Sequence, residues 1–178
     1  MSRISLTEYE TSPQEVKEQY ERQIDKNGQI THMKRTLLHS LPSYKAYMKW
    51  YVLRDEIVPF LGERTFTIFA HSISSQTDCL ICSTFFRRIL IEWGESPDSL
   101  LLDPIETLLV EFGRQIATDS NSVSDPLYEA LRKIFDEEQI VLLTAFAGIM
   151  IATNVFNNVL RIDLDPYLEN FTKKEQGK

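Results

Sequence analysis

Apolar residues recur along most of the chain at intervals of three and four, which is the spacing of one face of an α-helix. The clearest case is the segment 61–75, where the apolar side chains fall one helical turn apart: Phe66, Phe69, Ala70 and Ile73. Few stretches alternate between apolar and polar residues as a half-buried strand does. The six glycines and seven prolines separate the periodic segments, as residues that end helices do. The pattern predicts an all-α fold.

The prolines, glycines and capping residues that bound the apolar periods predict where the helices begin and end. In chain order the expected helices span about residues 13–27, 42–58, 61–75, 79–93, 104–116, 124–131 and 136–160, with a short segment around residues 33–38 between the first two. We expect them to form a single domain over residues 1–178, with a disordered polar tail near residues 172–178.

The last predicted helix is apolar almost all round, so we expect it at the centre of the fold or at a subunit interface. The aromatic face between Tyr44 and Tyr51 also suits a buried or intersubunit position. Together these surfaces are more than a small helical monomer covers comfortably, and they predict a homo-oligomer.

Composition narrows the possible partners. The net charge is −7 and no run is rich in lysine and arginine, so a surface for nucleic acid or anionic lipid is not expected. No apolar run approaches the roughly 20 residues of a membrane span, and the first residues carry no apolar signal region. We therefore expect a soluble, cytoplasmic protein with no membrane partner.

The only two cysteines, Cys79 and Cys82, are separated by two residues. At this spacing on a helix the thiols share one face, where they can form a disulfide or a paired thiolate. Thr77 or Asp78 is the expected N-cap, which places Cys79 in the first turn, where the helix dipole lowers a thiol pKa. We therefore predict that Cys79 attacks, that Cys82 resolves, and that both sulfurs face inward. The competing interpretation is a pair of small, buried, inert hydrophobes.

His71 is the candidate proton acceptor near the cysteines. It lies with Thr67 and Ser74 on a polar strip that runs toward Asp78, and an unperturbed histidine pKa of about 6.5 suits a general base. The competing interpretation is a polar residue on the flank of a helix.

Other chemistries have weaker support. One cysteine pair with His32, His39 and His71 lacks the spacing of a four-ligand zinc site, so no metal site is predicted. No glycine-rich phosphate loop is present, and no cofactor is predicted. Arg87 and Arg88 could attract an anionic substrate, although adjacent arginines on a helix more often form a solvated face or a salt bridge.

The order of helices and three motifs resemble the carboxymuconolactone decarboxylase family, within the alkylhydroperoxidase D-like superfamily. The motifs are the turn 78–82 after an apolar helix, the loop 120–125, and the end of the final helix at 152–158. The resemblance covers most of the chain. It implies an all-helical bundle that assembles as a homo-oligomer, and a family in which some members reduce peroxides through the cysteine pair.

The chain departs from this family at two positions. Peroxidase-type members have a glutamate twelve residues before the first cysteine and a histidine four residues after the second, which form a proton relay. Here those positions are Thr67 and Phe86, neither of which accepts a proton at working pH. His71, one helical turn from Thr67, is the nearest substitute.

Three function classes follow from the residues and the resemblance. The first is a thiol-dependent antioxidant oxidoreductase of the peroxidase or disulfide reductase type. It would act on a hydroperoxide or another small molecule through Cys79 and Cys82, and an external dithiol or disulfide reductase would restore both thiols. The second is a catalytically degenerate, oligomeric binding or scaffold protein of the same family. The third is a lactone decarboxylase.

Overall fold

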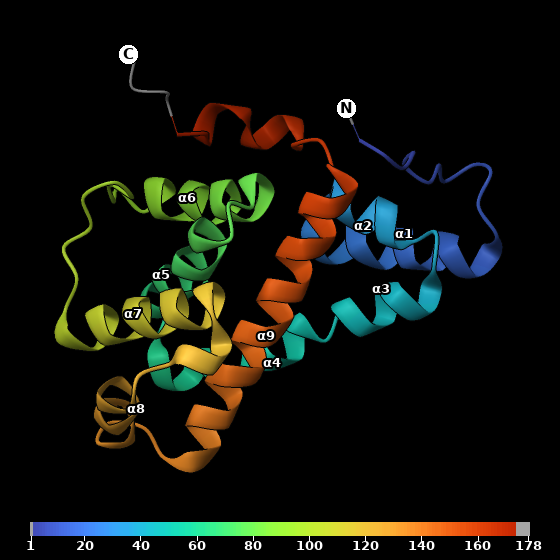
Figure 1. Cartoon of the computed structure of the whole chain (residues 1–178). Helices are drawn as coiled ribbons and strands as arrows, with labels where there is room; N and C mark the ends of the chain where they lie inside the picture. The colour runs from blue at the N-terminus through green and yellow to red at the C-terminus, as the bar shows by residue number, and fades with distance from the viewer. Residues whose placement is uncertain (1, 174–178) are drawn as a thin grey trace.

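The computed structural model of the chain describes residues 2–173. Within them the chain forms α-helices and short 3-10 helices and no strand, which confirms the predicted all-α class (Figure 1). The elements are α1 (Gln14–Asn27), α2 (His32–Leu37), α3 (Leu41–Tyr47), α4 (Trp50–Leu61), α5 (Glu63–Gln76), α6 (Leu80–Glu92), α7 (Pro104–Thr118), η1 (Ser120–Ser122), α8 (Asp125–Arg132), α9 (Glu137–Leu160) and η2 (Pro166–Phe171).

Helix α9 crosses the middle of the molecule, with α1 to α3 on one side and α5 to α8 on the other (Figure 1). The main core is aromatic at its centre: the ring of Phe146 lies 4.8 Å from that of Phe66 and 6.0 Å from that of Phe69. A smaller apolar cluster holds α1, α2 and α3 together through Tyr20, Leu37 and other buried side chains. Helices α5, α6 and α9 all contribute buried side chains to the main core.

Buried polar contacts fix the start of α5 against α7. Arg64 of α5 forms ion pairs with Glu95 and with Glu106, and the Glu106 side chain is almost fully buried. Glu106 also completes a capping box with Asp103, in which each residue bonds to the other's backbone N–H at the start of α7. One carboxylate thus both caps α7 and ties it to α5.

The prediction of a single helix over residues 42–58 is wrong in its middle and at its C-terminal end. The chain breaks at Met48 and Lys49 into α3 and α4, and α4 continues through Pro59 to end at Gly62, whose φ is 80°. Pro59 is tolerated because it lies in the last turn, where its missing N–H removes one hydrogen bond and the freed carbonyl is on an exposed residue. The next helix consequently starts at Glu63 rather than at residue 61.

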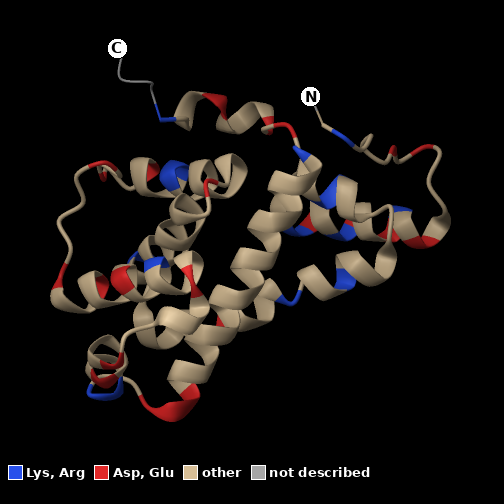
Figure 2. Cartoon of the chain, in the orientation of Figure 1, with Lys and Arg blue, Asp and Glu red and all other residues tan. Residues whose placement is uncertain are grey.

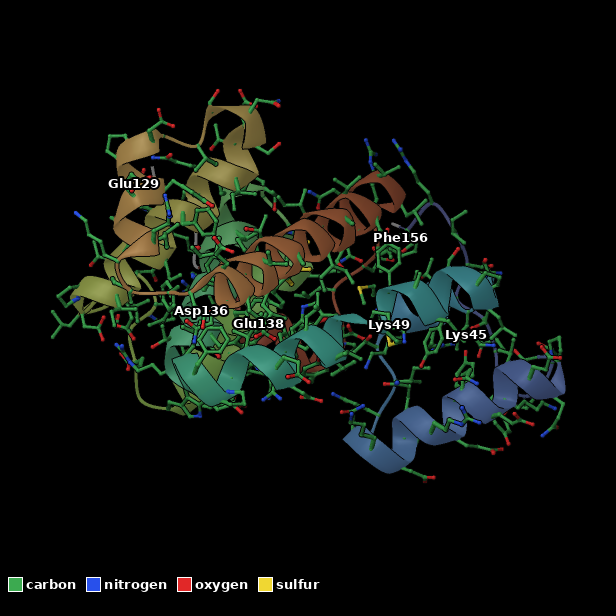
Figure 3. All side chains as sticks on the ribbon, turned by 90° about the horizontal axis from the view of Figure 1, so that it is seen from below. Lys45, Lys49, Glu129, Asp136, Glu138 and Phe156 are labelled. Carbon is green, nitrogen blue, oxygen red and sulfur yellow. The ribbon has the colours of Figure 1, made fainter. Side chains whose placement is uncertain are left out.

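The break between α3 and α4 sends neighbouring aromatic side chains into different places. Tyr44 packs in the small cluster of α1 to α3, and the Tyr47 ring lies 5.4 Å from that of Phe156 near the end of α9 (Figure 3). Trp50 instead packs against the main core, where its ring lies 5.7 Å from that of Phe146. The side chains of the predicted aromatic face thus pack against other parts of the same chain.

Helix α9 occupies the central place that its apolar sequence predicts. It is free of charged residues after its acidic start (Figure 2). Its inner face contributes Leu143, Phe146, Ala147 and Met150 to the core, while an outer face stays exposed: Val141, Ala145, Gly148, Ala152, Val155 and Val159. By length and mean hydropathy α9 also passes as a membrane span, contrary to our expectation that no segment would, although the central helix of a globular protein passes the same test.

The disordered tail expected near residues 172–178 falls almost wholly outside the described residues. Thr172 and Lys173 are described, and the Thr172 hydroxyl donates to the Glu169 carbonyl at 3.1 Å.

The close approach of α7 to α5 at Gly113 yields a stability prediction. A Cβ on Gly113 of α7 would lie 2.5 Å from the Ser72 hydroxyl oxygen and 3.0 Å from Ile73 of α5. We expect Gly113→Ala to lower the free energy of unfolding by about 1–2 kcal/mol, because overpacking outweighs the gain in helix propensity.

Urea denaturation measures this change, and the Ser72→Ala background provides the control. Removing the hydroxyl relieves the nearest clash, so the cost of Gly113→Ala should fall by about half or more in the double mutant. An equal cost in both backgrounds would show that the approach of α5 and α7 does not limit this position.

Candidate active site

The cysteine pair follows a sharp turn between α5 and α6. Thr77 ends α5, Asp78 has a positive φ of 50°, and Cys79 itself is the N-cap of α6. The expected cap at Thr77 or Asp78 is therefore wrong by one or two residues, and Cys79 lies before the first turn rather than in it. Asp78 takes the left-handed conformation that aspartate tolerates better than most residues.

Both thiols are free and buried, as predicted from their inward stripe. Cys79 is 1% exposed and Cys82 is 7% exposed. The side-chain amide of Asn157, near the end of α9, donates to the Cys82 sulfur at 3.2 Å and approaches the Cys79 sulfur at 3.8 Å. The two sulfurs therefore share one polar partner, which belongs to another helix, α9.

Two neighbouring asparagines hold the turn that carries Cys79. Asn154 donates to the Thr77 hydroxyl at 2.7 Å, and Asn158 donates to the Thr77 carbonyl at 3.0 Å. In the sequence these asparagines belong only to the motif at 152–158 and have no predicted role at the site. The signal for them is an asparagine followed one helical turn later by two more in an otherwise apolar helix.

The electrostatic environment separates the two thiols. A hydrogen bond from the Cys82 thiol lowers the pKa of Cys79, and the backbone N–H groups of Cys82 and Ile81 at the helix start, together with Asn157, lower it further. The same bond to Cys79, together with burial, raises the pKa of Cys82. The environment of the pair therefore favours the thiolate at Cys79 and the protonated thiol at Cys82.

A cavity of about 800 Å³ lies beside the pair. Cys82 is part of its wall, whereas Cys79 is not. Thr67 and Phe86, the two positions at which the chain departs from the peroxidase relay, also line it. Most of the other lining side chains are aromatic or aliphatic, among them Trp50, Phe66, Ile81, Phe85, Ile89 and Met150. A molecule in this cavity would meet the Cys82 sulfur in a largely apolar environment.

His71 lies apart from this cavity. Its Nε2 is 3.4 Å from the Ser75 hydroxyl, and within residues 2–173 it shares no hydrogen bond with either sulfur. Burial, and then the charge of Arg87, lower the pKa of His71 to about 4, so the ring is neutral at neutral pH. Its role as a substitute base stays a prediction.

The other two histidines have local partners. His32 lies 3.0 Å from the Asp163 carbonyl, and His39 lies 2.8 Å from the Ser5 carbonyl. In the described part of the chain, no three histidine, cysteine, aspartate or glutamate side chains gather as metal ligands would.

The two adjacent arginines have different surroundings. Arg87 makes a bidentate ion pair with Asp98, at 2.9 Å and 3.0 Å, and is not part of the cavity wall. Arg88 does line the cavity, with its guanidinium 5.5 Å from the ring centres of Phe85 and Tyr167. Of the two, Arg88 is therefore placed to meet a bound molecule.

No family model and no curated protein sequence matches the chain. Solved structures do match it. An uncharacterized peroxidase-related protein from Silicibacter sp. TM1040 superposes with a TM-score of 0.78 at 16% identity, covering 94% of this chain and 93% of the other. An uncharacterized peroxidase-related protein from Ralstonia eutropha JMP134, described as an alkylhydroperoxidase AhpD core, gives 0.77 at 18% identity over 94% of both chains. The chain thus has the alkylhydroperoxidase D-like fold that the resemblance predicted.

The amide contact leads to a prediction about thiol ionisation. Asn157→Ala removes a donor that favours the thiolate, so the pKa of Cys79 should rise toward the ordinary value of about 8.5. Titration followed by the ultraviolet absorbance of the thiolate should show a midpoint at higher pH than in the wild type.

Asn158→Ala is the matched control, because it removes a neighbouring amide that contacts the turn but neither sulfur. It should leave the midpoint near the wild-type value. If both variants move it equally, the turn and not the direct contact sets the ionisation.

Proposed function

We propose that the chain is a thiol-dependent peroxidase that uses Cys79 and Cys82 as a redox pair. The observation that carries the proposal is a free thiol pair, whose environment favours the thiolate at Cys79, at the wall of an apolar cavity. Buried cysteines used only for packing do not need this polar environment, because a structural thiol is raised in pKa by burial rather than lowered. The peroxidase-related names of the structural neighbours agree with this class of reaction.

The reaction consumes one hydroperoxide and oxidises both thiols. A thiolate attacks the terminal oxygen of the hydroperoxide, the O–O bond breaks, and the alkoxide takes a proton to leave as an alcohol. The attacking sulfur becomes a sulfenic acid, which the second thiolate attacks to form the disulfide; the hydroxide that leaves takes a proton from solvent and becomes water. An external dithiol or disulfide reductase then reduces the disulfide and is oxidised in turn.

Charge and access favour opposite orders of attack. The lowered pKa favours Cys79, the attacking sulfur predicted from the sequence, but only Cys82 lines the cavity. We favour Cys82, because the sulfur must reach the peroxide oxygen, whereas the Cys82 proton can move to Cys79. The Cys79 thiolate would take the Cys82 proton, pass it to the leaving alkoxide, and then attack the Cys82 sulfenic acid.

The missing relay should make turnover slow. With Thr67 and Phe86 in the cavity wall, the pair has no carboxylate or imidazole of the family pattern beside it. General acid–base help is typically worth roughly 10²–10⁴-fold in rate, so the helix start, Asn157 and the pair itself must supply what remains. This departure is also what favours the second candidate, a non-catalytic binding protein that uses the same cavity.

We also propose that the exposed face of α9 mediates self-association. Val141, Val155 and Val159 are each more than half exposed on this face, although α9 is otherwise a core helix. Together with Ala145, Gly148 and Ala152, which are also exposed, the valines follow one another at intervals of three and four residues. They form one continuous apolar stripe that a second copy would cover.

The catalytic prediction is that the purified protein consumes an organic hydroperoxide in the presence of a dithiol. Cys79→Ser and Cys82→Ser should each lower the rate of hydroperoxide consumption to that of the reaction without protein. In Cys79→Ser, a sulfenic acid probe should label Cys82. Labelling of Cys79 in Cys82→Ser, with none of Cys82 in the reciprocal variant, would restore the order predicted from the sequence.

His71→Ala serves as the control within the same assay. His71 is outside the cavity wall and already neutral at neutral pH. The turnover of the His71→Ala variant should therefore stay within about twofold of the wild-type turnover. A larger loss in a variant of unchanged melting temperature would support His71 as the base. No hydroperoxide consumption by the wild type, with both thiols reactive toward an alkylating agent, would leave the binding protein as the better description.

The association prediction is that light scattering at low micromolar concentration gives a mass above that of the monomer. Val155→Glu on α9 should reduce this mass, because it places a charge within the apolar stripe. Val52→Glu, on the exposed side of α4 and with equal exposure, should not. A monomeric wild type would contradict the proposal.

A further inference from the structure

One wall of the cavity carries a buried ammonium group. Lys34 of α2 is 6% exposed, and its Nζ donates to the Gln23 side-chain oxygen at 2.5 Å and to the Tyr51 hydroxyl at 2.8 Å. Among the described residues, no carboxylate lies within 4.0 Å of this nitrogen, and its third N–H has no acceptor. The charge of Lys34 acts on the carboxyl of Asp165, which lines the same cavity, from beyond ion-pair distance. A buried cation whose direct partners are neutral oxygens is incompletely compensated, so this part of the wall favours an anion.

A second cation lies over the same aromatic ring as the first. The Lys26 ammonium is 4.9 Å from the centre of the Tyr51 ring, and the Lys34 ammonium is 5.2 Å from it. Lys26 is exposed and also lines the cavity, and it has no ion pair in the described part of the chain. Lys26 can therefore attract an anion from solvent, and Lys34 can bind it inside.

The acidic residues of the same wall are largely occupied. Asp55 and Glu63 both pair with Arg54, at 3.1 Å and 2.6 Å. Asp165 accepts the backbone N–H of His32 at 2.8 Å, but its second oxygen has no partner among the described residues. Asp165 is thus the one lining carboxylate that would compete by attracting a cationic ligand instead.

The rest of the cavity suits an apolar body. On the side of the cysteines the wall is formed largely by Phe66, Ile81, Phe85, Phe86 and Ile89. Pockets of this size and character typically bury an apolar ligand and orient it with a few polar groups. Among the cations that line the cavity, Arg54 and Arg88 are paired with Glu63 and Glu92, whereas Lys26 and Lys34 have no ion pair in the described part of the chain. The two lysines lie at a part of the wall formed by different helices from the one that carries Cys82.

We propose that the cavity binds an amphipathic carboxylate, with the carboxylate on Lys34 and the apolar chain toward Cys82. If the proposed peroxidase function holds, on which this part rests, the preferred substrate is the hydroperoxide of a fatty-acid-like molecule. The redox step is unchanged: the hydroperoxide becomes the corresponding hydroxy acid, and the two thiols become the disulfide. The carboxylate of the substrate takes no part in that step and only positions the molecule.

Binding can be measured without catalysis, because both tryptophans of the chain, Trp50 and Trp93, line the cavity and report on it by fluorescence. Decanoate, 1-decanol and decylammonium share one chain and differ in the charge of the head group. Each is titrated into the reduced protein below its micelle concentration. Decanoate should bind at least about tenfold more tightly than decanol, since a charge-assisted hydrogen bond replaces a neutral one.

The variant Lys34→Met should remove most of this preference while keeping the affinity for decanol within about threefold, because methionine preserves the apolar stem. Lys34→Arg keeps the charge and should keep the preference. Lys45→Met, on the exposed face of α3 and outside the cavity wall, is the matched control and should behave as the wild type. If Lys34→Met is unfolded by circular dichroism, Lys34→Arg and the ligand comparison on the wild type still decide.

Three outcomes overturn the inference. They are equal binding of decanoate and decanol by the wild type, tighter binding of decylammonium, which would assign the head group to Asp165, and no fluorescence response to any of the three ligands.

The same proteins are then assayed for peroxidase activity with a fatty acid hydroperoxide and with its methyl ester. Decanoate selectivity without hydroperoxide consumption refutes the proposed function and leaves the carboxylate site standing. Consumption of acid and ester at equal rates, with no effect of Lys34→Met, refutes the carboxylate site and leaves the peroxidase standing.

Discussion

The amide of Asn157 is the contact on which the arrangement of the sulfurs depends. It reaches both cysteines from α9, a helix whose inner face is the centre of the aromatic core. The position of Asn157 is therefore set by the packing of side chains such as Phe146 two to three turns earlier on the same helix. Since the cysteines begin a different helix, the geometry of the pair follows from how α9 packs against α5 rather than from the CxxC spacing alone.

The replacement of the relay changes two properties of the cavity together. A glutamate and a histidine at the positions of Thr67 and Phe86 would be buried, because both present side chains are only 3% exposed. Burying such groups costs desolvation free energy, and in a peroxidase the same groups transfer protons. With Thr67 and Phe86 this chain avoids that cost. The cavity wall beside Cys82 is also more apolar than a glutamate and a histidine would make it. The residues that we propose slow proton transfer should thus also improve the fit of an apolar chain.

Features that depend on local periodicity could be predicted from the sequence. The helical class, the inward stripe of the sulfurs and the central place of α9 all follow from apolar spacing within one segment. The break at Met48 and Lys49 could not, because it is set by where Tyr47 and Trp50 pack against α9. The same holds for Asn157, whose role depends on residues 75 and 78 positions earlier in the chain. The N-cap was misplaced for a related reason, since Asp78 adopts a positive φ that its sequence permits but does not require.

The cavity also joins two parts of the core that otherwise have little in common. Lys34 belongs to the small lobe of α1 to α3, and Cys82 to the main core. Met33 and Phe156 are side chains that pack against both clusters. A molecule that reached from Lys34 to Cys82 would add contacts to each lobe at once, and any ligand that binds only the folded state stabilises it. A ligand in the cavity would therefore stabilise the packing of α1 to α3 against the main core. Because Lys34 lies on α2, the proposed site and the packing of α1 to α3 would depend on each other.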